Sequence, residues 1–157
     1  MERFDGACAP SSYPSRWRTV RQWERLDAHA MSLPIFLVED NVLIQTNLSA
    51  ALEELAGARI VGMAPSEARA VHWLEGHPGD WKLAVVDLFL AQGTGLGVVD
   101  SCRARAADQR VVVLTNYATA DIAQQALGKG ADALFDKSVD LEAFFDFCTA
   151  HRRALHL

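Results

Sequence analysis

Three acidic side chains, one hydroxyl and one amine stand at the ends of short apolar runs in this sequence. Glu39 and Asp40 follow the first run, Asp87 ends the third, Thr115 ends the fourth, and Lys137 follows the fifth. Carboxylate oxygens without accompanying His or Cys favour Mg²⁺ over zinc, and Mg²⁺ keeps an open position for a phosphate oxygen. A carboxylate can itself form an aspartyl-phosphate when a metal and an ammonium neutralise the transferred group. Together, the five side chains could carry phosphoryl transfer.

Convergence of these residues depends on the elements that position them. Taken singly, an acid at a strand end is more often a helix cap or a solvated surface group. The apolar runs alternate with segments of helical period, which is typical of βαβ units and a parallel sheet. We predict strands over 34–39, 59–63, 82–87, 110–115 and 132–136. We predict helices over 41–56, 65–75, a segment from 98 to 102, 118–127 and 140–153.

The (βα)₅ order predicts an α/β fold, a flavodoxin-like doubly wound parallel sheet with strand order 2-1-3-4-5. The first and third strands are then neighbours, so Asp40 and Asp87 would face each other across the crevice at the carboxyl ends of the strands. Three carboxylates gathered there repel one another unless a cation lies among them. The predicted apolar stripe of the first helix consists of Val42, Leu43, Leu48, Leu52 and Leu55.

The composition narrows the function classes. A chain of 157 residues has room for one domain, and it lacks both a membrane-spanning apolar run and a secretion signal, so a cytoplasmic location is expected. The net charge is −5, and residues 1–32 hold five of the 15 bases but only four of the 20 acids. An acidic remainder argues against direct nucleic-acid binding. The three cysteines are far apart and are interpreted as reduced thiols.

Two further patterns could suggest a function, but we interpret both as structural. The segment GTGLG at 93–97 resembles a nucleotide loop, but the third glycine of a dinucleotide fingerprint would fall on Val98, so we interpret it as a turn. The five histidines are interpreted as surface residues. They are His29, His72, His77, His151 and His156.

Four segments resemble the signatures of response-regulator receiver domains of bacterial two-component signalling. They are IFLVEDN (35–41), VVDL (85–88), VLTN (113–116) and GADALFDKS (130–138). The separations between the key residues also match the family's layout. The resemblance implies that Asp87 accepts a phosphoryl group and that Thr115 and Lys137 contact it. It also implies that Mg²⁺ is held by three carboxylates and one main-chain carbonyl, those of Glu39, Asp40, Asp87 and Phe89.

The resemblance further implies partners and a domain organisation. A histidine kinase or histidine phosphotransfer protein would supply the phosphoryl group, and an unidentified downstream protein would receive the signal. Residues 34–157 would form the receiver domain, of the stand-alone single-domain type, because the chain ends soon after the fifth helix. Residues 1–33 are predicted as a flexible N-terminal extension, whose segments 16–18 and 21–25 could instead dock on a partner or on acidic lipid. Phe147 could serve a homodimer face.

The chain departs from the family pattern at several positions. Ser138 replaces the common proline after the lysine, and Leu134 replaces the common switching aromatic, while Phe135 should point to the opposite face of the sheet. Phe89 and Tyr117 are bulky neighbours of the site, and our hypothesis is that they shield the aspartyl-phosphate from water. The alternative function is a pseudo-receiver that binds partners without being phosphorylated. A phosphatase with an aspartate nucleophile is disfavoured, because Phe89 stands where its second acid is expected.

Overall fold

Strands and helices alternate along residues 31–157, the part of the chain that the computed structural model describes. The strands are β1 (Leu33–Val38), β2 (Ala58–Ala64), β3 (Leu83–Val86), β4 (Arg110–Thr115) and β5 (Ala133–Asp136). The helices are α2 (Val42–Ala56), α3 (Glu67–Gly76), α4 (Gly95–Ser101), α5 (Ala120–Gly128) and α6 (Leu141–Leu155). Of the predicted extension, all but residues 31–33 lies outside the described residues, together with its segments 16–18 and 21–25.

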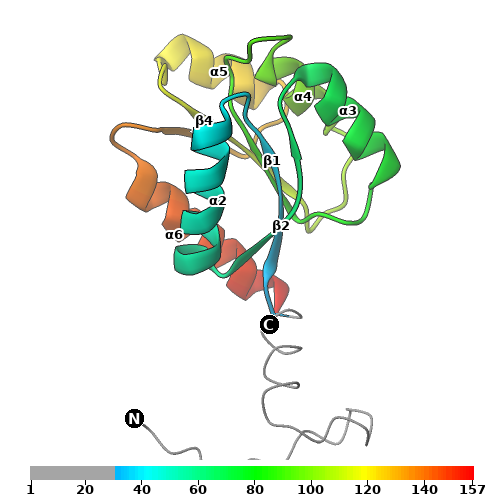
Figure 1. The fold of residues 1–157 in the computed structure, drawn as a ribbon, viewed down its shortest axis with the longest axis vertical. Coiled ribbons are helices and arrows are strands. Elements are labelled where there is room, and N and C mark those ends of the chain that lie inside the picture. The colour runs from blue at the N-terminus through cyan, green and yellow to red at the C-terminus, as the bar shows by residue number, and fades with distance from the viewer. Residues whose placement is uncertain (1–30) are drawn as a thin grey trace, which may run out of the picture. The chain divides into compact units, whose positions relative to one another are not determined.

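All neighbouring strands pair in parallel, and their order is β2-β1-β3-β4-β5. The predicted fold class and strand order are therefore confirmed. Figure 1 shows α2 and α6 on one side of the sheet and α3 and α4 on the other. Alternate residues of the central strands point to the two sides, so Ile35 and Leu37 pack with α2 and α6, whereas Phe36 and Val38 pack towards α3 and α4. Two apolar layers thus hold the sheet between its helices.

Side chains at the starts of four helices accept backbone N–H groups from the first turn. Asn41, Ser66, Thr94 and Thr119 do so at the starts of α2, α3, α4 and α5. The prediction that Pro65 lies in the first turn of the second helix is wrong, because Ser66 takes the capping position and accepts the N–H of Arg69 at 3.3 Å. Serine offers a cap acceptor that proline lacks.

The predicted apolar stripe of α2 is only partly correct. Leu52 is buried, but Val42, Leu43 and Leu55 are exposed. The buried line instead runs through Leu52 and Ala56, which are four residues apart and therefore share one helix face. Because adjacent residues in a helix point about 100° apart, a stripe chosen from the large apolar residues included some that lie away from the buried line.

His151 is buried, so the prediction that it is a surface residue is wrong. Its Nε2 lies 3.0 Å from the carbonyl oxygen of Lys82, on the amino-terminal side of β3. His151 follows Cys148 by three residues on α6, so it faces the same side of that helix as the buried core. Because its ring is buried and bound to a main-chain carbonyl, His151 has a structural role.

A stack of three rings crosses from the central strand β1 to α3. Phe36 and Trp73 have ring centroids 4.2 Å apart, and Trp73 and His77 have theirs 4.3 Å apart. The indole lies over Gly62 of the edge strand β2, where an added Cβ would be only 2.5 Å from the Trp73 ring. The absence of a side chain at Gly62 therefore makes room for the stack.

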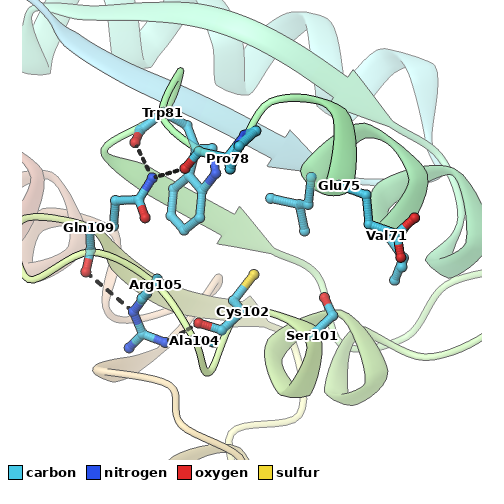
Figure 2. Close-up of a pocket in the computed structure, with 10 residues that line it drawn as sticks. Val71, Glu75, Pro78, Trp81, Ser101, Cys102, Ala104, Arg105 and Gln109 are labelled. Carbon is cyan, nitrogen blue, oxygen red and sulfur yellow. Dashed lines mark hydrogen bonds between the residues drawn. The ribbon is translucent and has the colours of Figure 1, made fainter.

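Gln109 joins two loops at the amino-terminal end of the sheet. Its side chain is buried beside a pocket of about 160 Å³ that Trp81 and Cys102 also line. Figure 2 shows the side-chain amide nitrogen reaching two main-chain carbonyl oxygens, those of Pro78 at 2.9 Å and Trp81 at 2.8 Å. The amide oxygen accepts the N–H of Ala106 at 3.0 Å. One side chain thus satisfies three backbone groups.

We expect Gln109→Ala to lower the free energy of unfolding by about 2–4 kcal/mol, because buried backbone groups lose their partners. Urea unfolding followed by circular dichroism measures the change. Gln124→Ala on the exposed side of α5 is the matched control, and it should change stability by less than about 0.5 kcal/mol. Equal effects of the two substitutions would contradict this role of Gln109.

None of the helices within residues 31–157 has the length and apolar character that crossing a bilayer requires.

Candidate functional site

Three carboxylates meet at the carboxyl ends of β1 and β3, which are neighbours in the sheet. Glu39 and Asp40 follow β1, and Asp87 follows β3, with the N–H of Asp87 donating to the carbonyl of Val38 at 2.9 Å. One oxygen atom from each carboxylate lies within 4.8 Å of the other two. The structure therefore brings together the three acids that the strand order predicts to converge.

Lys137 completes this cluster from the end of β5. Its Nζ lies 2.9 Å from Glu39 Oε2 and 3.3 Å from Asp87 Oδ2. The Lys137 side chain is 14% exposed, Glu39 is 2% exposed and Asp87 is 13% exposed, so water screens these ion pairs weakly. The backbone N–H of Lys137 donates to the carbonyl of Thr115 at 2.9 Å, which ties the end of β5 to the end of β4.

Thr115 and Phe89 lie at the same edge but have other partners in this structure. Thr115 is fully buried, and its Oγ1 accepts the N–H of Tyr117 at 3.2 Å. The N–H of Phe89 lies 3.4 Å from Asp87 Oδ1, while its ring is exposed and meets the ring of Tyr117 edge-on, with centroids 4.9 Å apart. The hydroxyl of Thr115 thus points into its own loop, next to the aromatic pair.

The charge balance of the cluster favours a divalent cation. Burial raises the pKa of Glu39 above its ordinary value, although hydrogen bonds from Lys137 Nζ and from the N–H of Asn41 act to lower that pKa. Three acids face one ammonium, so negative charge is in excess when all are ionised. Their donors are hard oxygens, the ligands that Mg²⁺ prefers. The residues present therefore fit a magnesium ion.

Sequence reasoning missed several groups that hold these acidic residues in place. Gln45 of α2 donates from Nε2 to the main-chain carbonyl of Glu39, and Asn41 donates its N–H to Glu39 Oε1 at 3.2 Å. Asp40 Oδ2 accepts the N–H of Ala91 at 2.8 Å, from the loop that follows Asp87. Asn41 could have been found as a capping residue before an apolar helix. The Asp40–Ala91 hydrogen bond joins residues that follow two different strands, so no local sequence pattern predicts it.

The structure shows where the residues that depart from the family pattern lie. Leu134 packs against the apolar layer of α3 and α4, and Phe135 packs against the other layer, which confirms that they face opposite sides. Phe147, suggested for a homodimer face, is partly buried and meets the Phe135 ring with centroids 5.8 Å apart. The bond between Lys137 and Ser138 is trans, like every other peptide bond of the described chain.

Comparison with known proteins identifies a family and several relatives. The family model described as response regulator receiver domain matches residues 35–148. The acid tolerance regulatory protein ActR of Rhizobium meliloti (strain 1021) is 32% identical over 108 residues, which cover 69% of this chain and 54% of ActR. The photosynthetic apparatus regulatory protein RegA of Rhodobacter capsulatus is 32% identical over 127 residues, covering 77% of this chain and 64% of RegA. The chain thus spans less than two thirds of the length of either relative.

Solved structures of low sequence identity share the fold. A chain of the crystal structure of the CheX-CheY-BeF3-Mg+2 complex from Borrelia burgdorferi has a TM-score of 0.64 and 16% identity, and the match covers 80% of this chain and 90% of that one. A response regulator from Burkholderia pseudomallei, solved with a phosphorylated aspartic acid, calcium ion and citrate, has a TM-score of 0.63 and 24% identity. That match covers 80% of this chain and 71% of the other. Family model, relatives and fold agree, and the chain belongs to the response regulator receiver domain family.

Proposed function

We propose that this chain receives a phosphoryl group on Asp87 and signals by changed contacts with other proteins. The donor is the phosphohistidine of a histidine kinase or a histidine phosphotransfer protein. The observation that carries the proposal is the Asp87 carboxylate, which lies beside two further acids and 3.3 Å from the Lys137 ammonium. We assign this role to residues 34–157 in the cytoplasm, with residues 1–33 as an extension.

Each group of the site has a stated part in the transfer. A carboxylate oxygen of Asp87 attacks phosphorus as the bond from phosphorus to the donor's imidazole nitrogen breaks. Glu39, Asp40 and Asp87, with the main-chain carbonyl of Phe89, would hold Mg²⁺. When bound, Mg²⁺ supplies positive charge that neutralises the phosphoryl oxygens. Lys137 is already placed to pair with an oxygen of the new group on Asp87.

The phosphorylated side chain would alter the surface around β4 and β5. It adds about −1.5 to −2 charges beside Lys137, which now pairs with Glu39 and Asp87. The hydroxyl of Thr115, whose oxygen accepts the N–H of Tyr117, would donate its hydrogen to a phosphoryl oxygen, and the loop after β4 would move with it. Leu134 occupies the position of the usual switching aromatic, so the change would reach partners through the loops that follow β4 and β5. The downstream protein binds there.

Intact mass spectrometry tests the proposal. The wild-type chain is incubated with acetyl phosphate and Mg²⁺, and it should gain one phosphoryl group. The same incubation with excess EDTA should give none, because the three carboxylates need the cation. A wild-type chain that never gains a phosphoryl group, from acetyl phosphate or from any histidine kinase, would be a pseudo-receiver, and the proposal would be wrong.

The aromatic pair predicts a long-lived phosphoryl group. Phe89 follows Asp87 by two residues, and its ring contacts that of Tyr117. We expect Phe89→Ala and Tyr117→Ala each to shorten the half-life roughly threefold or more, the factor given by about 0.7 kcal/mol in the barrier to hydrolysis. The half-life is measured by intact mass spectrometry, as the rate at which the mass of the phosphoryl group is lost after the phosphoryl donor is removed. Leu127→Ala, which changes an exposed side chain on α5, should leave the half-life unaltered.

A further inference from the structure

The glycine-containing segment at 93–97 encloses the carboxylate of Glu67. Glu67 is the first residue of α3, and its Oε2 accepts the N–H of Thr94 at 2.7 Å. The N–H of Glu67 in turn donates to the carbonyl of Gln92 at 3.3 Å. Two hydrogen bonds therefore join the start of α3 to the loop between β3 and α4.

The glycines leave room for that side chain. A Cβ on Gly97 would overlap the Glu67 carboxylate, and a Cβ on Gly93 would overlap the Glu67 side chain near its own Cβ. Gly93 also has φ +78°, a backbone conformation that other residues rarely adopt. The interpretation of this segment as a turn is thus incomplete, since Gly95 and Gly97 already belong to α4. The space between Gly93 and Gly97 is shaped for a carboxylate of the same chain.

The same segment lies directly against the phosphoacceptor strand. The N–H of Gly95 donates to the carbonyl of Leu88 at 2.9 Å, and a Cβ on Gly95 would overlap the main-chain oxygen of Asp87. Phe89 and Thr94 form an antiparallel bridge. The chain between Asp87 and Gly95 is therefore a closed loop, which Glu67 holds at Thr94.

A second carboxylate holds the middle of this loop. Asp40 Oδ2 accepts the N–H of Ala91 at 2.8 Å. The loop that carries the main chain of Phe89 is thus fixed by Asp40 from the acidic cluster and by Glu67 from α3. Within residues 31–157, Glu67 forms no hydrogen bond or ion pair with Glu39, Asp87 or Lys137, so it can act on the site only through the loop.

We propose that Glu67 is a positioning residue for the cation site. Its carboxylate fixes the loop after Asp87 and so holds the Phe89 carbonyl where the cation binds. The inference rests on the proposed function, since it concerns the affinity of the same site for Mg²⁺. It also explains why the segment 93–97 is rich in glycine, because each of its glycines gives space either to Glu67 or to the Asp87 main chain.

Magnesium affinity is the first test, measured by isothermal titration calorimetry on the unphosphorylated full chain. Glu67→Ala should weaken binding about tenfold or more, the usual effect of removing a group that supports metal ligands. Glu67→Gln should weaken it less, because an amide oxygen still accepts the Thr94 N–H. Glu75→Ala removes an exposed acid from the same helix and should leave affinity unchanged. Of these three variants, only Glu67→Ala should show faster hydrogen exchange of the Thr94 amide.

A double substitution separates positioning from a general loss of stability. Gly97→Ala places a methyl group on the Glu67 carboxylate and should also weaken Mg²⁺ binding. Adding Glu67→Ala removes the overlap, so the double variant should bind Mg²⁺ no more weakly than Glu67→Ala alone. Additive losses of affinity would overturn the inference, because two independent structural defects would then explain them.

The remaining outcomes are distinct. If the wild type binds Mg²⁺ and Glu67→Ala binds it equally well, the inference is wrong and the proposed function stands. If Glu67→Ala does not fold, as judged by circular dichroism, Glu67→Gln carries the same comparison with Glu75→Gln. A folded wild type without any affinity for Mg²⁺ would overturn the proposed function and this inference with it.

Discussion

Asp87→Asn is expected to gain no phosphoryl group under conditions in which the wild-type chain is fully modified. The asparagine has nearly the same shape and can still accept the N–H of Phe89, but its neutral amide is not a nucleophile. The substitution also removes one of the three carboxylates that would hold Mg²⁺. Intact mass after incubation with acetyl phosphate and Mg²⁺ gives the result directly, and complete loss is the expected size of the effect.

Asp100→Asn provides the matched control for this experiment. Asp100 is an exposed acid on α4 that pairs with Arg103, so the variant removes the same charge from the same part of the chain. It should be phosphorylated like the wild type. If Asp87→Asn were still modified, peptide mapping would show which other carboxylate accepts the group, and the assignment of Asp87 would be wrong.

Lys137→Met should give the second large effect, on both reaction and stability. Loss of a positioned charge near the transferred group should slow phosphorylation by about 10²-fold or more. Because Glu39 is only 2% exposed and would lose its ammonium partner, the free energy of unfolding should fall by about 3 kcal/mol near pH 7. Lys82→Met breaks a far more exposed pair, with Asp108, and should cost less than about 1 kcal/mol.

The stability loss in Lys137→Met should depend on pH. Burial raises the pKa of Glu39, so the folded state takes up a proton more readily than the unfolded state, and stability is lost as pH rises through the folded pKa. Removing Lys137 raises that pKa further, because the lysine hydrogen bond acts to lower it. The stability lost in Lys137→Met should therefore become smaller as the pH is lowered from about 7 to about 5. Urea unfolding at both pH values measures it, and a deficit independent of pH would contradict the role given to Glu39.

The sequence was sufficient to predict the sheet and the meeting of its acids. Strands buried on both faces are unbroken apolar runs, so 110–115 could be predicted with the observed bounds. The parallel order then places the carboxyl ends of neighbouring strands together, which is why Asp40 and Asp87 could be paired from positions far apart in the chain. Repeating local patterns and one topological rule account for this success.

The remainder depends on packing that no local pattern records. Whether Leu55 or Ala56 of α2 is buried depends on the rotation of the helix on the sheet, and apolar character alone chose the wrong one. The burial of His151 depends on its reach to the Lys82 carbonyl. Glu67 was missed because its partner, Thr94, lies 27 residues away, in the loop that precedes α4. Such contacts leave a trace only where, as at Gly97, the partner residue is unusually small.

The ring stack over Gly62 implies that two distant positions cannot change independently. Any side chain at Gly62 would displace the Trp73 indole, and a smaller residue at 73 would leave a gap against Phe36. We therefore expect homologous sequences that have lost the tryptophan to tolerate larger residues on the edge strand, and those that keep it to retain glycine there. Positions 62 and 73 should drift together during divergence, as a coupled pair.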